Sequence, residues 1–405
     1  MTSAAGSGRL RVGDVRWCGV SEGKIRRARP VFNEEVIRYL YDWMTERHLI
    51  FKRKNAGEPA PWTTDPVLLQ WRFCNVRREL DRESRALIER IVKNPDLCYR
   101  AKVLNCIWFR LFNKQETFEI LGPLKLEDFA ALHAVPRVFQ HYKERFEEYR
   151  RSHPSYQFFT NAFHTRGLLA QWKQPPQLNG GEVASDNERM LYMIDHIYSS
   201  GLLAKIAVTA DPSYVKPGLT QSDVFNTLCT IRGIGSFLAY QMFVDFTYIA
   251  EFPFSENEFT VSCPGCKAGL SKLFDDRAGM SDEELLFWLR DSLEAAFNSR
   301  NLPFNQHELF DDLPEDCARL NVMCLENAMC ELSKYTRVRQ DAGTPRVRYE
   351  ASTAPLPGAT TVWNTGKGSV KTASSGAKKR TAAVQPTLDR YLVKKTAVGV
   401  GEGAG

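Results

Sequence analysis

The strongest constraint on the fold is a stretch near the middle of the chain, LCTIRGIGSFLAYQMFVDF, at residues 228–246. Helical sequence precedes it at Thr220–Cys229 and continues after it at Ser236–Phe246. Gly233 and Gly235 between these segments permit unusual backbone angles, and the apolar Ile234 can anchor the turn in a core. The stretch therefore predicts two helices joined by a tight turn.

A turn of this kind aims backbone N–H groups of the second helix outward, where a phosphate can sit. This is the layout of a helix-hairpin-helix, which holds the DNA backbone and reads no sequence. The alternative is a glycine-containing turn between two packed helices without a ligand, because short patterns of this kind arise by chance. We expect a DNA-binding element made of Gly233, Ile234, Gly235, Ser236 and Gln241.

Most of the remaining body also reads as helix. Asn33 precedes apolar residues at helical spacing and is a good N-cap, and Ser185 with Glu188 and Ser281 with Glu284 are capping-box pairs. Further helices are expected at Leu68–Val92 and Ala318–Tyr335, and strands only at Phe259–Val261 and Arg346–Tyr349. The fold class is therefore mostly α.

The two ends of the chain carry its excess charge. Residues 1–30 hold seven basic and two acidic side chains, and residues 351–405 hold eight and two. The last segment has too little apolar content to offset its ordering entropy. We expect a flexible basic arm at 1–30, a helical body at 31–350 and a disordered basic tail at 351–405. No stretch reaches the roughly 20 apolar residues of a membrane helix, so no membrane partner is expected.

Ten cysteines are scattered without the regular spacing of a disulfide scaffold. Reduced thiols in the nucleus or cytosol are the simpler interpretation, since the first residues show no secretory signal. Cys263 and Cys266 form a CxxC pair, but the second pair that a zinc site requires is missing at a suitable spacing. Unpaired thiols are therefore favoured over zinc, and we expect neither metal nor cofactor.

A second polar constellation lies in PWTTDPVLLQWRFCNVRRELDRESRAL, residues 61–87. On a helix, Asn75, Arg78 and Arg82 would share a face with Glu79, and Arg77 would pair with Asp81. The alternative is a helix laced with surface salt bridges. Because apolar side chains of the same segment already fill the core-facing positions, asparagine beside arginine suits phosphate or base recognition.

The first 24 residues of this segment resemble the helical domain found with 5-hydroxymethyldeoxyuridine DNA kinases, a group allied to the α-glutamyl/putrescinyl-thymine pyrophosphorylases. Three further stretches match in the same order: WFRLFN (Trp108–Asn113), GIGSFLAYQMFVD in the hairpin, and LENAMCELSKYTRV (Leu325–Val338). The resemblance covers about residues 33–340. It implies a helix-hairpin-helix body of the DNA-glycosylase type that acts in hypermodification of thymine-derived bases in DNA.

The resemblance also implies a polar centre. Its members would be Asp65, Asn75, Arg78, Asp81, Arg82, Arg110, Asn113, Gln241, Asp245, Glu326, Glu331 and Lys334. One departure is the sequence Cys263–Cys266, where family members carry a glycine-rich, GPG-like loop; if that loop approaches a phosphate, a cysteine stands where glycine is expected. The chain contains no P-loop motif, so we do not expect it to be the kinase itself.

Glycosylases that use such a hairpin carry a carboxylate further along the chain, and some carry a lysine on the second helix. Phe237 occupies the lysine position here, which disfavours a covalent lyase mechanism. Glu256 and Glu258 fall nearest to the carboxylate position, and we take Glu258 as the candidate for general-base or electrostatic work. The alternative for both is a solvated acidic loop.

The basic tail contains a sequence that resembles the motif by which repair and replication proteins dock on the sliding clamp. Its docking residues would be Gln385, Leu388, Tyr391 and Leu392, with chance as the alternative. Two hypotheses follow for the whole chain. The first is a nuclear DNA-binding enzyme that flips a modified thymine-type base out of the helix and modifies or excises it. The second is a non-catalytic DNA-binding module recruited to the clamp.

Overall fold

The computed structural model describes residues 29–126, 134–160, 165–172, 186–207, 219–312, 320–345 and 348–349. These residues form helices almost throughout, as the sequence predicts. The sheet found among them has two antiparallel strands, β1 (Val31–Phe32) and β2 (Phe274–Asp276). No helix in these ranges is both long enough and apolar enough to cross a membrane.

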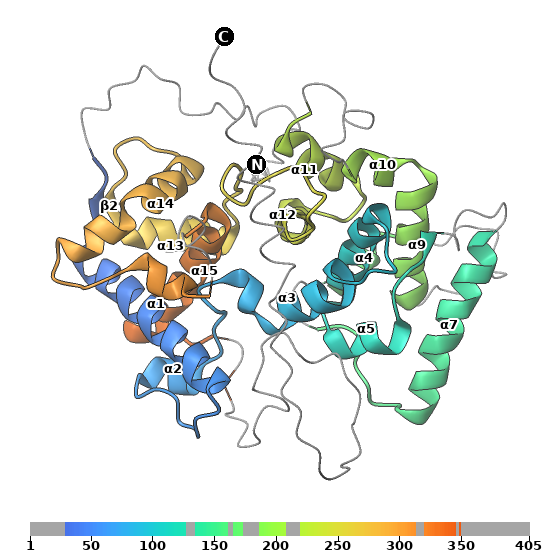
Figure 1. The fold of residues 1–405 in the computed structure, drawn as a ribbon, viewed down its shortest axis with the longest axis horizontal. Helices are drawn as coiled ribbons and strands as arrows, with labels where there is room; N and C mark the ends of the chain where they lie inside the picture. Colours follow the sequence, from blue (N-terminus) through green and yellow to red (C-terminus); the bar gives the residue numbers. More distant parts are fainter. Residues whose placement is uncertain are drawn as a thin grey trace, which may run out of the picture.

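Figure 1 shows two groups of helices side by side. The first group, on the left, packs around one apolar core with β1 and β2, and Trp43 and Tyr335 are fully buried in it. Its elements are α1 (Glu34–Asn55), α2 (Pro66–Gln70), α13 (Pro264–Leu273), α14 (Asp282–Asn298), the short helix at Gln306–Phe310, and α15 (Val322–Arg339).

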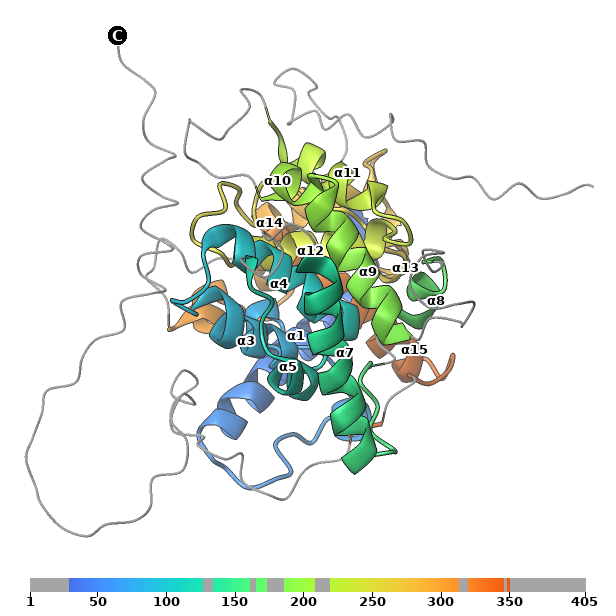
Figure 2. The ribbon, with the colours of Figure 1, turned by 90° about the vertical axis from the view of Figure 1, so that its right-hand side faces the viewer.

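The second group surrounds a separate core in which Trp108 and Phe243 are fully buried. Figure 2 looks onto this group, with α7 and α9 towards the viewer. Its elements are α3 (Arg82–Leu87), the π-helical turn Ile88–Val92, α4 (Tyr99–Phe112), α5 (Gln115–Leu121), α7 (Ala134–Ser152), α8 (Thr165–Leu169), α9 (Asp186–Ser199), α10 (Leu202–Ile206), α11 (Gln221–Thr230) and α12 (Ser236–Thr247). The single-turn helix η1 (Arg78–Leu80) lies between α2 and α3 in the chain, at the passage from one group to the other.

Local capping explains where several helices begin. Asn33 caps α1, because its side chain accepts a hydrogen bond from the N–H of Val36 at 3.1 Å. Ser281 and Glu284 form the predicted capping box of α14. The predicted last helix is confirmed as α15, which runs four residues further than expected at its C-terminal end. Ser185 lies outside the described residues, although the helix it was expected to cap, α9, is present.

The prediction of one helix over Leu68–Val92 is wrong. Helix α2 ends at Gln70, and non-helical chain then leads to η1. Distant groups hold this chain: Trp71 forms a β-bridge with Arg348, and the N–H of Cys74 donates to the Glu331 carboxylate at 3.0 Å. These bonds compete with helical ones for the same backbone groups.

The predicted strand at Phe259–Val261 is absent, because this segment is irregular chain leading into α13. Of the other predicted strand, residues 346–347 lie outside the described residues, and Arg348 contributes only the isolated bridge. Most of the basic arm, residues 1–28, and the whole tail with its clamp-like motif also lie outside them.

Candidate functional site

The two helices and the turn predicted around Gly233 are present. Gly233 has a φ of +84°, and a Cβ atom there would lie 3.0 Å from the carbonyl oxygen of Leu168. Glycine is therefore required both by the backbone angle and by the close approach of α8. Ile234 is 3% exposed and anchors the turn in the core of the second group, as expected. The indole N–H of Trp172 donates to the Arg232 carbonyl at 2.8 Å and braces the turn.

The start of α12 faces outward. Gly235 is its N-cap, Ser236 and Phe237 follow, and all three are exposed. Gln241, expected with them as a DNA contact, is buried in a different environment one turn further along the helix. The exposed end of the hairpin and the buried part of α12 are therefore two separate features.

A buried group of polar side chains, which we call the seam cluster, lies where the two helix groups meet. It consists of Arg78 of η1, Gln241 of α12 and Glu326 of α15. The Nη2 atom of Arg78 donates to Gln241 Oε1, and its Nη1 atom lies 3.6 Å from Glu326 Oε2. All three residues are less than 9% exposed. The cluster therefore joins the two cores by ionic and hydrogen-bonded contacts.

Burial and charge act against each other in the seam cluster. Burial would lower the pKa of the Arg78 guanidinium, but the nearby Tyr248 hydroxyl and Glu326 carboxylate outweigh burial and raise it. Burial raises the pKa of Glu326, while Arg78 and the thiol of Cys263 oppose that rise. Burial also raises the pKa of Tyr248. Arg78 therefore remains a fixed cation at the junction.

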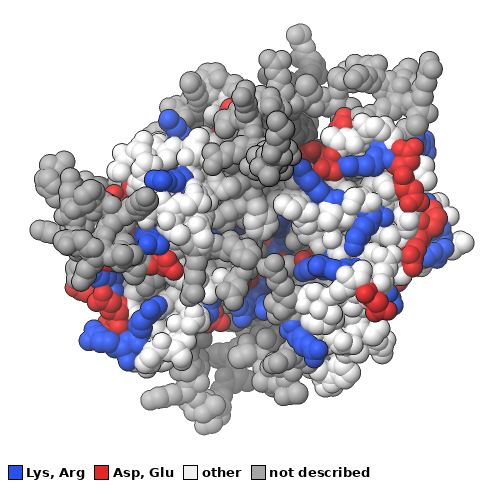
Figure 3. Space-filling view, turned by 180° about the vertical axis from the view of Figure 1, so that it is seen from behind, with Lys and Arg blue, Asp and Glu red and all other residues white. Residues whose placement is uncertain are grey.

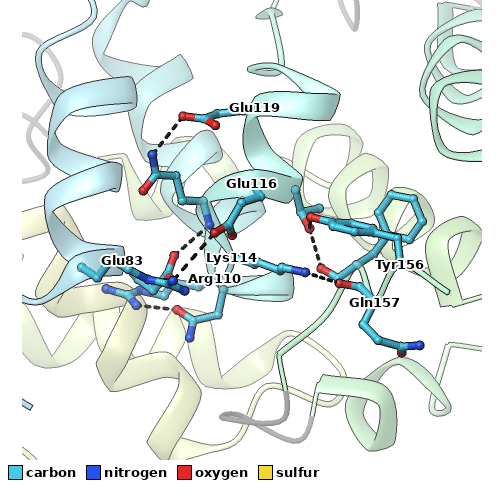
Figure 4. A network of polar contacts seen from close by, with 12 residues as sticks. Glu83, Arg110, Lys114, Glu116, Glu119, Tyr156 and Gln157 are labelled. Atoms are coloured by element: carbon cyan, nitrogen blue, oxygen red, sulfur yellow. Dashed lines mark hydrogen bonds and ion pairs between the residues drawn. The ribbon is translucent and has the colours of Figure 1, made fainter. Parts of the chain in front are cut away.

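A second buried ion pair connects α4 to α12. The Nη2 atom of Arg110 donates to Asp245 Oδ1 at 2.6 Å, and its Nε atom donates to the other carboxylate oxygen. The remaining Nη1 atom donates to Asn113 Oδ1 at 2.8 Å, at the point where Asn113 ends α4 with a φ of +49°. Figure 4 shows Arg110 beside Glu83 and Lys114 in the surrounding polar network. Because both oxygens of Asp245 bind Arg110, this carboxylate positions the guanidinium.

Asn75 and Asp81 form a smaller unit next to Arg78 in the chain. Asp81 Oδ1 accepts from the backbone N–H of Asn75 at 2.7 Å, and Asn75 Nδ2 donates to the Leu80 carbonyl at 2.7 Å. Within the described chain, two buried atoms here lack a hydrogen-bond partner: Asn75 Oδ1 and Arg78 Nη1. Buried polar atoms in folded proteins normally have a partner, which for these two can be a water molecule or a bound ligand.

Titration of Asp81 gives a testable consequence. Burial raises its pKa from an ordinary 3.8 to about 6, against the opposing effects of the Asn75 N–H and Arg47. The folded state thus binds this proton more tightly, and its contribution to stability is full below pH 4 and is lost as pH rises through 6. Asp81→Asn should remove this loss, of about 1–3 kcal/mol.

The measurement is the free energy of unfolding of both proteins by urea between pH 4 and pH 7. Titration of His48, whose pKa burial lowers to about 4, is common to both and cancels in the difference. Parallel curves over this range would show that Asp81 titrates normally.

Other predicted site residues have local partners elsewhere. Asp65 is the N-cap of α2, accepts from the N–H groups of Val67 and Leu68 at 2.8 Å each, and receives the Tyr335 hydroxyl at 2.5 Å. Arg82 is exposed and pairs with Glu83 of α3 and Glu116 of α5, which are both labelled in Figure 4. Glu258 is exposed and contacts Gln221 at 2.9 Å, while Glu331 and Lys334 form an ion pair of 2.6 Å. The polar centre that the resemblance implied is therefore divided into several separate groups of side chains.

Tyr248 is a member of this environment that the sequence reasoning missed. It lies within electrostatic range of Arg78 and Asp245. Its position at the end of the predicted second helix, seven residues or two helical turns after Gln241, was a usable signal.

The Cys263–Cys266 loop is the first turn of α13 and packs against α15. Cys263 is the N-cap, and its N–H approaches Glu326 Oε1 at 3.4 Å, so this N–H faces an internal carboxylate. Cβ atoms placed on Gly265 and Gly269 would lie 3.0 Å from Cys330 Sγ and 2.1 Å from the Met329 carbonyl oxygen. In the described ranges, no group of three His, Cys, Asp or Glu side chains is arranged to hold a metal ion.

Comparisons with known proteins agree with this arrangement of motifs. Residues 34–344 match the family model described as 5-hmdU DNA kinase, helical domain. The 5-hmdU DNA kinase of Bacillus phage SP10 is 24% identical over 309 residues, which are 73% of this chain and 44% of the relative. The match thus spans less than half of that relative, and no solved structure matches the chain. Because the model covers most of its length, the chain belongs to the family of the helical domain of 5-hmdU DNA kinase.

Proposed function

We propose that the chain is a DNA-binding enzyme that acts on a modified uracil, of the 5-hydroxymethyluracil type, in DNA. The observation that carries this proposal is the seam cluster, a buried arginine held by Gln241 and Glu326 with part of its hydrogen-bonding capacity unfilled. The printed name of the phage relative supplies the base, since that protein is a 5-hmdU DNA kinase.

The chemistry of the unfilled groups suits a pyrimidine. The edge of a uracil alternates carbonyl oxygens with one N–H group, so it offers acceptors to a guanidinium and a donor to an amide oxygen. Arg78 Nη1 and Asn75 Oδ1 supply this pair of functions. A base can reach buried groups only after it leaves the base stack. We infer that the flipped base enters at the seam, where Arg78 would also stabilise negative charge on a departing group.

Binding gives a test that does not depend on the unknown co-substrate. Oligonucleotides that differ in one base, 5-hydroxymethyluracil or cytosine, would compete for the full-length protein in fluorescence anisotropy, because cytosine lacks the N–H and one carbonyl oxygen of the uracil edge. We expect the modified oligonucleotide to bind at least about fivefold more tightly, which corresponds to the lower end of one good base contact. Gln241→Met should remove this preference, because Arg78 loses its acceptor.

Gln221→Met is the matched control, since Gln221 is also buried but contacts Ser255 and Glu258 at the start of α11. It should keep the preference. Mass spectrometry of the same oligonucleotides tests for excision, which needs only water and leaves an abasic site. Equal affinity for both oligonucleotides, with no change in mass, would contradict base recognition.

Equal affinity for the two oligonucleotides would favour the alternative function, a non-catalytic DNA-binding module. The feature that favours it is the hairpin, whose exposed Gly235 and Ser236 can approach a phosphate without any base chemistry. Recruitment to the sliding clamp through Gln385, Leu388, Tyr391 and Leu392 remains a proposal in either case, as does a nuclear location. Figure 3 shows lysine and arginine side chains across the middle of one face, which suits a polyanion.

A further inference from the structure

Several unpaired cations gather near the C-terminal end of α1, away from the hairpin. The residues are Arg47 and Lys54 of α1, Arg72 after α2, and Arg348, and we call them with Trp62 and Trp71 the cationic surface. Lys54 and Arg72 lie within electrostatic range of each other. The bridge between Trp71 and Arg348 brings the distant end of the body to the same place.

No carboxylate of the described residues lies within ion-pair distance of these four cations. Two carboxylates of this region are already engaged: Glu46, next to Arg47 in the chain, binds Arg53 at 3.2 Å, and Glu331 binds Lys334 at 2.6 Å. Asp81 lies within electrostatic range of Arg47 but accepts its hydrogen bond from Asn75. Positive charge is therefore concentrated here without direct compensation.

Like charges crowd together on this surface, and they lower the pKa of Lys54. Burial lowers the pKa of Lys54, and the neighbouring guanidinium groups of Arg47 and Arg72 lower it further. Arg47 also has a buried Nη1 atom without a hydrogen-bond partner, although its Nε atom donates to the Phe73 carbonyl at 3.4 Å. An anion bound at this surface would relieve the repulsion between these cations.

Aromatic rings alternate with these cations. The ammonium group of Lys54 lies 4.8 Å from the centre of the half-buried Trp62 ring, and the guanidinium of Arg348 lies 5.4 Å from that of Trp71. Cations that track phosphates, beside an aromatic ring on which a base can stack, are the usual design of single-strand binding surfaces. The half-buried Trp62 can serve as such a ring, whereas Trp71 is buried and only supports Arg348.

The cationic surface is linked to the candidate site through the chain around Phe73. Arg47 contacts Phe73, and two residues further along the chain lies Asn75 with its unfilled oxygen. We propose that the cationic surface binds the phosphates of the single DNA strand that carries the target base. This inference rests on the proposed function and adds to it the surface that binds the backbone of the substrate strand.

The test is a triple variant, Lys54→Gln with Arg72→Gln and Arg348→Gln, in the full-length protein. Its affinity for a fluorescent single-stranded oligonucleotide should fall at least tenfold. The slope of log affinity against log salt should become shallower by about 2, since each lost phosphate contact on a single strand contributes roughly 0.7.

The matched control is Lys52→Gln with Arg90→Gln and Arg290→Gln. It removes the same charge from cations that are paired with Asp311, Glu119 and Asp291 at 2.6, 2.8 and 2.7 Å. The control should bind within about twofold of the wild type, because its carboxylates already compensate the cations.

The outcomes separate the two proposals. A wild-type protein that binds no DNA would overturn the proposed function. If the wild type binds but the triple variant and the control lose affinity equally, only the cationic surface is wrong. Binding of duplex without binding of single strands would likewise overturn the inference while the proposed function stands.

Discussion

Replacing Asp245 with leucine is expected to lower the free energy of unfolding by about 3–5 kcal/mol. Asp245 is fully buried and binds Arg110 through both carboxylate oxygens. The variant leaves the guanidinium in the interior without this carboxylate, although Arg110 also donates to Asn113 and Ser84 at 2.8 and 3.3 Å. Urea denaturation near pH 7, followed by circular dichroism, measures the loss.

A second variant tests the cause. The double replacement Arg110→Leu with Asp245→Leu removes both charges, and it should recover most of the lost stability because no unpaired charge remains. Asp291→Leu is the control, since Asp291 pairs with Arg290 in an exposed position and should cost less than about 1 kcal/mol. A single Asp245 variant as stable as this control would contradict a structural role for the buried pair.

Replacing Gly269 with alanine is the second change with a large expected effect. A Cβ atom at Gly269 would lie 2.1 Å from the carbonyl oxygen of Met329, and backbone cannot move aside as a flexible side chain can. Helices α13 and α15 would have to separate, at a cost on the order of 3 kcal/mol or more. The midpoint of thermal unfolding should fall accordingly.

Gly167→Ala is the matched control for that experiment. Gly167 is also in a helix, α8, but nothing lies within 4 Å of the position its Cβ would take. Alanine there should leave stability unchanged or raise it by up to about 1 kcal/mol, because glycine is the weaker helix former. Equal effects at the two positions would show that α13 and α15 are not in backbone contact.

Local signals in the sequence were enough to predict several of the helices, including α1 and α14. The caps at Asn33 and Ser281 act within three residues of themselves, so a single stretch of sequence contains the whole interaction. The conformation of the segment after Gln70 could not be predicted from local signals. Its conformation depends on Glu331 and Arg348, which are more than 250 residues away, and helical spacing of its arginines was therefore misleading.

Only part of the candidate site could be predicted, because its residues come from distant parts of the chain. Arg78, Gln241 and Glu326 come together as the resemblance implied, although only the tertiary fold shows that they meet between two cores. Asp65, which the resemblance places in the polar centre, also has a local role that its sequence context indicates. An aspartate directly before a proline is a common helix start, and Asp65 is the N-cap of α2 with Pro66 following.

The seam cluster also determines what a ligand would encounter on arrival. Arg78 has its orientation set by Gln241 and Glu326 before any ligand is present. The loss of side-chain freedom that accompanies recognition has therefore already occurred during folding, and a bound group need not order the guanidinium again. The same preorganisation makes the junction expensive to build, because the chain must keep a charge dehydrated between its two cores at all times. Affinity at this junction and the stability of the free protein are thus set by the same few bonds and cannot be adjusted independently.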